Sequence, residues 1–178
     1  MASQLRVDKI LPVDGAPTGG GGGIIQIVSS TKTDTASNST NSTSNWTGHG
    51  LEVRITPKFS TSKIYVYGQV SVNMAANDAI MVILNKGGSV LSGAVGDAET
   101  GRTQITASEE INYDFSNTSI PFQYLDSAGS TSELVYAPGL SISNTSSYTV
   151  YMNRTVNDAN NTSYGRAISV ITAMEVSA

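Results

Sequence analysis

Alternation of apolar and polar residues with a period of two dominates the chain after residue 23. In residues 63–73, Ile64, Val66, Val70 and Val72 share one face. Such a pattern places apolar side chains on one side of a β-strand. The same reading predicts strands at 24–30, 51–55, 63–73, 79–84, 102–107, 120–125, 133–142, 147–153 and 167–176.

The connecting segments carry the residues that favour turns and loops. Lys86-Gly87-Gly88 reads as a glycine turn, and residues 126–129 and 157–161 are rich in Asp, Asn and Gly or Ala. These residue types initiate turns through side-chain hydrogen bonds or positive φ angles. No helical period interrupts the pattern, so residues 24–178 are predicted to form a single all-β domain, a jelly-roll-type β-sandwich.

The stretch 33–47 is rich in Ser, Thr and Asn and resembles a low-complexity segment. Trp46 stands near its end, and a large aromatic residue there indicates that the segment packs against the domain.

Residues 1–23 differ from the rest and are predicted to form an extended arm with a glycine-rich linker. An unbroken glycine tract, Gly19 to Gly23, joins a short amphipathic stretch to the first strand. In that stretch apolar residues alternate with charged ones, so an extended arm presents one apolar face to the edge of a partner. The predicted docking residues are Leu5, Arg6, Val7, Asp8 and Ile10.

The run AIMVIL, residues 79–84, is apolar on both faces. A small isolated sandwich with one wet side cannot easily cover such a strand. The sequence therefore predicts a homotrimer in which Met81 and Ile83 face the symmetry axis.

Composition narrows the function classes. Charged residues make up 13% of the 178 residues, about half the roughly 25% typical of soluble domains. The net charge of −4 opposes nucleic-acid binding, and no apolar run is long enough to span a bilayer. The absence of cysteine removes disulfides, thiolate nucleophiles and cysteine metal sites.

The residues that carry acid–base or metal chemistry are few and scattered. His49 is the single histidine, and Gly48-His49-Gly50 predicts a surface turn. Glu109 and Glu110 are adjacent, so on a strand they point to opposite faces and cannot act as a catalytic pair. The oxygen-rich loop around Asp158 leaves calcium binding open, although it lacks the spacing of a known calcium loop. The sequence predicts no catalytic residue, no metal site and no cofactor.

Three segments carry a resemblance to a known group of proteins. MASQLRVDKILPVDGAPTGGGGGIIQIV, PFQYLDSAGSTSELVY and residues 151–176 are similar to the opening, a central strand-turn and the closing hairpin of tailed-phage virion proteins, especially from marine and cyanobacterial phages. Ala128 stands where those proteins frequently have proline.

The resemblance implies a jelly-roll head similar to the trimeric heads of complement C1q and tumour necrosis factor, and it implies no catalytic residues. The expected function is that of a non-enzymatic virion structural protein, assembled in the host cytoplasm. In this reading it is a trimeric tail-fibre knob that binds other virion proteins through its arm. The exposed loop carrying Asn157, Asp158, Asn160 and Asn161 is the candidate for contact with a host glycan or receptor. The alternatives are a capsid decoration (cement) protein and a carbohydrate-binding or depolymerising spike module.

Overall fold

The computed structural model describes residues 23–111 and 115–177, which form two packed antiparallel β-sheets with no α-helix among them. A single 3₁₀ turn, η1, spans Ser92–Ala94. The strands are β1 (Ile24–Lys32), β2 (Ala36–Thr40), β3 (Val53–Ile55), β4 (Lys63–Met74), β5 (Asp78–Lys86), β6 (Ser89–Val90), β7 (Ala107–Ile111), β8 (Thr118–Ser127), β9 (Leu134–Ile142), β10 (Tyr148–Met152) and β11 (Ser169–Val176).

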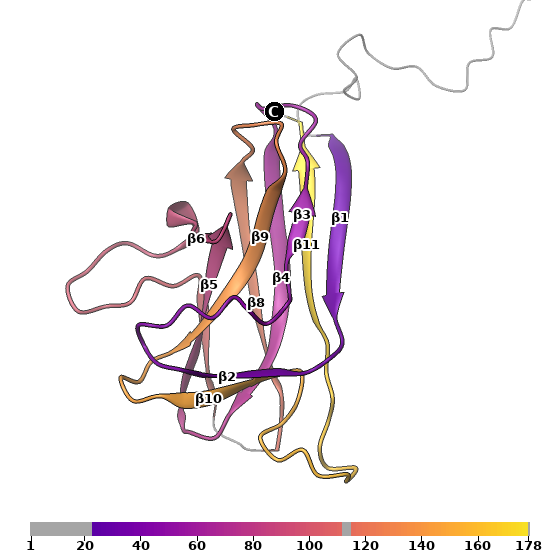
Figure 1. The fold of residues 1–178 in the computed structure, drawn as a ribbon. Coiled ribbons are helices and arrows are strands. Elements are labelled where there is room, and N and C mark those ends of the chain that lie inside the picture. Colours follow the sequence, from indigo (N-terminus) through magenta and orange to yellow (C-terminus); the bar gives the residue numbers. More distant parts are fainter. Residues whose placement is uncertain (1–22, 112–114, 178) are drawn as a thin grey trace, which may run out of the picture.

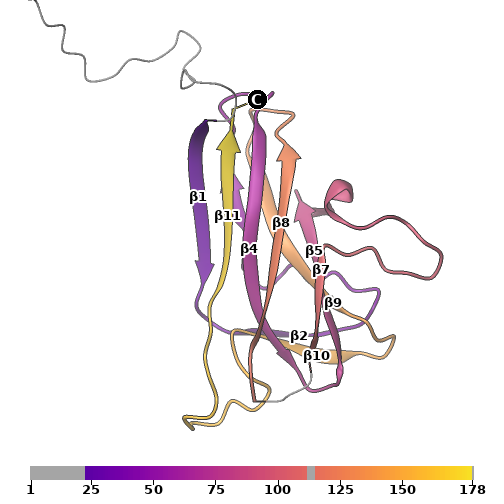
Figure 2. The same ribbon diagram turned by 180° about the vertical axis from the view of Figure 1, so that it is seen from behind.

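The strand order is that of a jelly roll. Sheet A runs β1-β11-β4-β8, and β10 with β2 continues it beside the last residues of β4. Sheet B runs β3-β9-β5, with β6 and β7 pairing along the free side of β5. Successive strands alternate between the sheets through much of the chain, as two interlocked Greek keys require. Figures 1 and 2 show the two layers from opposite sides.

The core lies between the inner faces of the sheets and follows the period-two pattern. Ile64 and Val66 from β4 and Ile80, Val82 and Leu84 from β5 belong to one hydrophobic core, and all five are fully buried. Burying an aliphatic side chain of this size contributes about 1.5–3 kcal/mol relative to leaving it exposed. The alternation in the sequence is therefore the source of the two-layer architecture.

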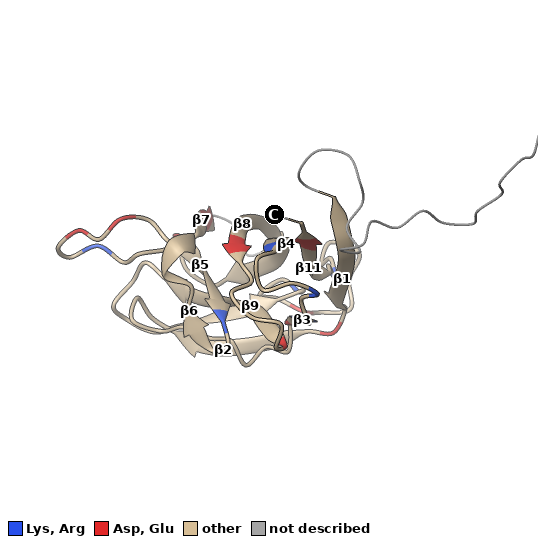
Figure 3. Cartoon of the chain, turned by 90° about the horizontal axis from the view of Figure 1, so that it is seen from above, with Lys and Arg blue, Asp and Glu red and all other residues tan. Residues whose placement is uncertain are grey.

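One strand prediction is wrong in its bounds, and one strand was not predicted. Residues 102–106 belong to an excursion between β6 and β7, and the strand begins only at Ala107. This excursion, residues 91–106, extends away from the sandwich and carries charges of both signs, Asp97, Glu99 and Arg102 (Figure 3).

Residues 36–40 form the strand β2, which pairs with β10, although their sequence resembles a low-complexity segment. The expectation that Trp46 packs down is confirmed by its backbone pairing with Leu140.

The sandwich has two distinct poles. At the terminal pole, the first and last described residues meet: the Ser177 amide donates to the Gly23 carbonyl at 2.9 Å. At the opposite end, the loop pole, residues 153–168 connect β10 to β11 and meet the start of β8 (Figure 1). Gly23 therefore lies at the end of the sandwich remote from this loop.

Candidate functional site

The loop pole is built on Asn153, which follows β10 directly. Its φ of 61° lies in the left-handed region, and Asn tolerates this better than most non-glycine residues. Its side chain is fully buried and donates to the carbonyls of Lys32 and Asp34, both at 2.9 Å. Its Oδ1 accepts from Ser169 Oγ at 2.7 Å. Asn153 thus fixes both ends of the loop against β1 and β11.

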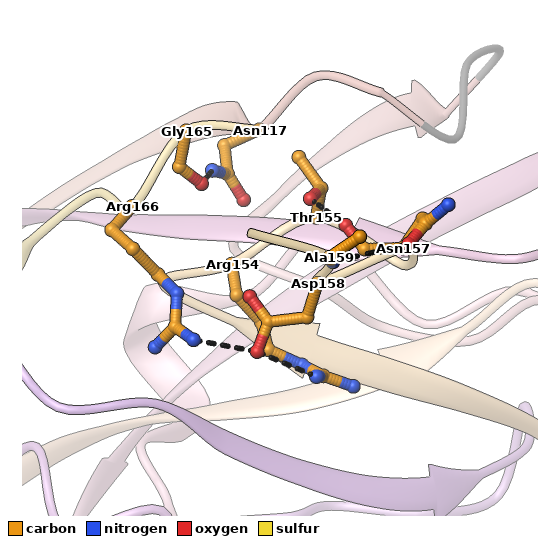
Figure 4. Close-up of polar contacts among 8 residues, drawn as sticks. All are labelled: Asn117, Arg154, Thr155, Asn157, Asp158, Ala159, Gly165 and Arg166. Carbon is orange, nitrogen blue, oxygen red and sulfur yellow. Dashed lines mark hydrogen bonds and ion pairs between the residues drawn. The ribbon is translucent and has the colours of Figure 1, made fainter. Parts of the chain in front are cut away.

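Asp158 joins two arginines that lie on either side of it in the sequence. Its Oδ2 accepts from Arg154 Nη1 at 3.1 Å and from Arg166 Nη2 at 2.6 Å (Figure 4). Partial burial acts to raise the pKa of Asp158, but the hydrogen bonds and positive charges of the two arginines outweigh it and lower the pKa. The carboxylate therefore stays ionised and holds both guanidinium groups in place.

The other predicted loop residues play separate parts. Asn157 Nδ2 donates to the Tyr164 hydroxyl at 2.9 Å, and its Oδ1 accepts from the Ala159 amide. Asn161 makes a turn in which its Oδ1 accepts from the Ser163 amide at 2.9 Å. Asn160 is exposed. Asn157 and Asp158 thus make separate sets of contacts in the same loop, and Asn160 and Asn161 are exposed. Because two cations already surround Asp158, this donor set does not suit calcium.

Phe115 and Tyr164 form an aromatic pair that the sequence did not predict, and Tyr164 is bonded to Asn157. Phe115 stacks on Tyr164 with ring centroids 5.7 Å apart and an interplanar angle of 22°. Phe115 is 59% exposed, the highest value among the large apolar side chains described. The Asn117 side chain donates to the Gly165 carbonyl at 3.0 Å and ties the two segments together. The signal in the sequence was weak, because 115 and 164 are far apart along the chain.

The second candidate surface is the outer face of sheet A. The strand register aligns Ile27, Met174, Tyr65 and Leu125 as one row across β1, β11, β4 and β8. Ile27 is 55% exposed and Leu125 is 53% exposed. This apolar row crosses the whole width of a sheet whose outer side no described segment covers (Figure 2).

Aromatic side chains continue the apolar row toward the middle of sheet A. Tyr65 and Tyr67 stack with ring centroids 5.4 Å apart, and the Tyr65 hydroxyl donates to Gln123 Oε1. A groove of about 420 Å³ lies beside them, lined also by Pro121 and by Ala107 at the start of β7. An open, concave aromatic surface of this kind is typical of a protein contact.

The predicted trimer contacts Met81 and Ile83 are buried within the single chain, at 6% and 5% exposure. They face the outer side of sheet B, which the segment preceding β3 partly covers. Asn45 lies over Gly139 there and donates to Asn85 Oδ1 at 2.8 Å. Ile83 is the floor of a groove of about 440 Å³ between that segment and the 91–106 excursion. Both side chains are therefore largely covered by the single chain itself.

His49 lies in a turn, as predicted, but the prediction that this turn places it at the surface is wrong. Its side chain is buried, Nε2 lies 2.7 Å from the Pro138 carbonyl, and Nδ1 accepts from the Leu51 amide at 3.1 Å. The second contact requires a bare Nδ1, so Nε2 carries the proton and donates to Pro138. Burial lowers the pKa of His49. His49 is therefore a neutral structural residue that packs edge-on against Trp46.

Among residues 23–111 and 115–177, no three His, Asp or Glu side chains gather in a way that suits a metal ion. Within the same ranges, no helix has the length and apolar character needed to cross a membrane. The predicted docking residues Leu5, Arg6, Val7, Asp8 and Ile10 lie outside the described residues.

Comparison with known proteins gives no family assignment: the sequence matches no protein-family model and no curated protein.

Proposed function

We propose that the protein is a non-enzymatic structural component of a tailed-phage virion, a homotrimeric knob that residues 1–23 attach to the tail or capsid. The resemblance of three segments to phage virion proteins supports the class. The geometry supports the arrangement, because the chain enters the head at the terminal pole and the loop of residues 153–168 lies at the opposite pole.

The observation that carries the proposal is the apolar row on the outer face of sheet A. Single exposed apolar residues are ordinary, but a continuous row across four strands marks an interaction surface. Ile27 and Leu125 are each more than half exposed, and they flank Met174 and Tyr65 in the register. Self-association covers this row with a different surface of another copy, since contact between two equivalent rows closes a dimer.

Three copies arranged around a threefold axis cover the apolar row of every copy and form a closed ring, not an open filament of subunits. In a cyclic trimer each head contributes one patch to each of two neighbours, and the ring closes. We therefore place the proposed trimer contact on the outer face of sheet A instead of at Met81 and Ile83.

The test is the oligomeric state of the full chain by mass photometry and light scattering. The expected result is a trimer, which Leu125→Lys converts to monomer because a charge then stands in the apolar row. Val90→Lys is the matched control: Val90 is 47% exposed but lies on β6 of sheet B. A monomeric wild type, or a trimer that survives Leu125→Lys together with Ile27→Lys, contradicts the proposal.

The number of copies per virion distinguishes a location on the tail from a location on the capsid. A tail appendage gives a few tens of copies or fewer, whereas a decoration protein gives hundreds. Quantitative mass spectrometry of purified particles measures this number.

A further inference from the structure

We propose that the loop pole binds an acidic saccharide, a sugar that carries a carboxylate, at a site formed by Phe115, Tyr164, Asn157, Asp158 and Arg166. We call this the aromatic–arginine site. The inference rests on the proposed function insofar as an exposed knob contacts a host surface, but its evidence lies entirely in the loop pole.

The aromatic pair provides the stacking surface. Tyr164 covers one side of the Phe115 ring, yet Phe115 remains 59% exposed. Exposing a large aromatic ring to water is unfavourable in free energy. Because Tyr164 holds the Phe115 ring in place, that ring offers a flat, rigid apolar surface to a ligand. The C–H face of a pyranose ring matches such a surface, whereas its hydroxyl groups need polar partners around the edge.

The same loop supplies polar groups: Asn157 bonds Tyr164 directly, and Asp158 and Arg166 lie within the segment 153–168 that carries Tyr164. Tyr164 accepts a hydrogen bond from Asn157, which leaves its own hydroxyl proton for a ligand. Asp158 uses Oδ2 for both arginines, and no hydrogen bond to Oδ1 is present among the described residues. Arg166 uses one of its five N–H donors on Asp158, and its side chain is 59% exposed. The site therefore offers both donors and an acceptor to sugar hydroxyls.

The charge of the site points to an anionic group on the sugar. The charged residues of the segment 153–168 are Arg154, Asp158 and Arg166, which sum to +1, whereas the whole chain carries −4. Arg154 also lies over the Tyr151 ring, with Cζ 4.3 Å from the centroid, so Arg166 is the more accessible cation. A guanidinium group pairs with a carboxylate through two parallel hydrogen bonds.

The site is held in place without a ligand. Asp158 orients both guanidinium groups, and Asn117 ties the Phe115 segment to Gly165 (Figure 4). Asn153 fixes the ends of the loop. Fixing these side chains in the free protein lowers the entropy lost on binding. One surplus positive charge on an acidic chain is too little for a nucleic acid, whose binding requires a broad basic surface.

The experiment uses the full-length protein and three oligosaccharides of equal length: an oligogalacturonate, a neutral maltooligosaccharide and a sulfated maltooligosaccharide. Saturation-transfer NMR and calorimetry at physiological salt measure binding. The expected result is binding of the oligogalacturonate and at least tenfold weaker binding of the neutral sugar. Arg166→Gln and Phe115→Ala each weaken oligogalacturonate binding about tenfold or more.

Arg102→Gln is the matched control, since it removes one exposed arginine from the 91–106 excursion and is expected to leave the affinity unchanged. Equal weakening by Arg102→Gln and Arg166→Gln, no binding of any sugar, or binding of the sulfated sugar alone overturns the proposal. Circular dichroism checks that each variant is folded, and mass photometry gives its oligomeric state. Sugar binding and trimer formation are thereby tested separately. A monomer that still binds oligogalacturonate overturns the trimer and keeps the site, and a trimer that binds none does the reverse.

Discussion

Gln26 on β1 donates a hydrogen bond of 2.6 Å from Nε2 to Oε2 of Glu175 on β11, which joins the beginning and the end of the described chain at the terminal pole. The other carboxylate oxygen of Glu175 accepts from the backbone amides of Lys58 and Phe59, at 2.7 and 3.2 Å. Glu175 is fully buried, so this one carboxylate holds β1, β11 and the loop before β4 together.

The first prediction concerns Glu175→Gln. Burial alone raises the pKa of Glu175, but the hydrogen bonds from Gln26 and the two backbone amides outweigh it and lower the pKa below 4.5. Glutamine presents an NH₂ group to these donors, so we expect a loss of about 1.5–3 kcal/mol at pH 7, measured by chemical denaturation.

The pH dependence of the same variant has a definite sign. A lowered pKa in the folded state stabilises the protein above pH 4.5, and this contribution is lost as pH falls through the folded pKa. Glu175→Gln is expected to lose part of this acid dependence, whereas Glu133→Gln, which removes an exposed partner of Arg54, keeps it. Identical acid profiles for the wild type and Glu175→Gln contradict the assignment.

A second pH effect follows from His49. Because burial lowers its pKa below 6.5, the unfolded chain binds more protons than the folded one between these two values. The free energy of unfolding therefore decreases as pH falls below 6.5 and levels off under the folded pKa. His49→Asn keeps an acceptor for the Leu51 amide and cannot titrate, so its stability is expected to be flat over this window. Thermal melts between pH 7 and pH 5 measure the difference.

The third prediction separates backbone strain from hydrogen bonding at Asn153. Asn153→Ala and Asn153→Gly both lose the hydrogen bonds to Lys32, Asp34 and Ser169. Alanine in addition adopts a positive φ, which costs about 1–2 kcal/mol more than in glycine. Alanine is thus expected to be the more destabilising substitution in denaturation experiments. Equal stability of the two variants contradicts the role of the φ of 61°.

The fourth prediction concerns the amino-terminal arm. Deletion of residues 2–18 is expected to leave a folded trimeric head, because the described core and the apolar row lie within residues 23–177. The same deletion is expected to abolish incorporation into particles, measured by mass spectrometry of purified virions. Normal occupancy of the shortened protein rejects a docking role for Leu5 to Ile10.

The strands that the sequence predicted well carry a regular or continuous set of apolar positions. β4 alternates between buried and less buried residues from Lys63 to Tyr67, and β5 is an apolar run that is buried from Ile80 to Leu84. β2 escaped notice because three of its five residues are exposed and none is strongly apolar; its strand geometry comes from backbone pairing with β10. β7 begins five residues later than predicted for a similar reason, since Glu109 and Glu110 are exposed along the side of β5.

The sequence by itself determined the all-β class, the positions of most strands and turns, and the loop that holds Asp158, because period-two burial and turn chemistry are local properties. Only the tertiary structure decided which residues distant in the sequence are neighbours and which side chains are buried. It covered Met81 and Ile83, buried His49, stacked Phe115 on Tyr164 and aligned Ile27 with Met174, Tyr65 and Leu125. These relationships depend on the register between strands distant in the chain, which the packing of the whole core fixes and no local pattern encodes.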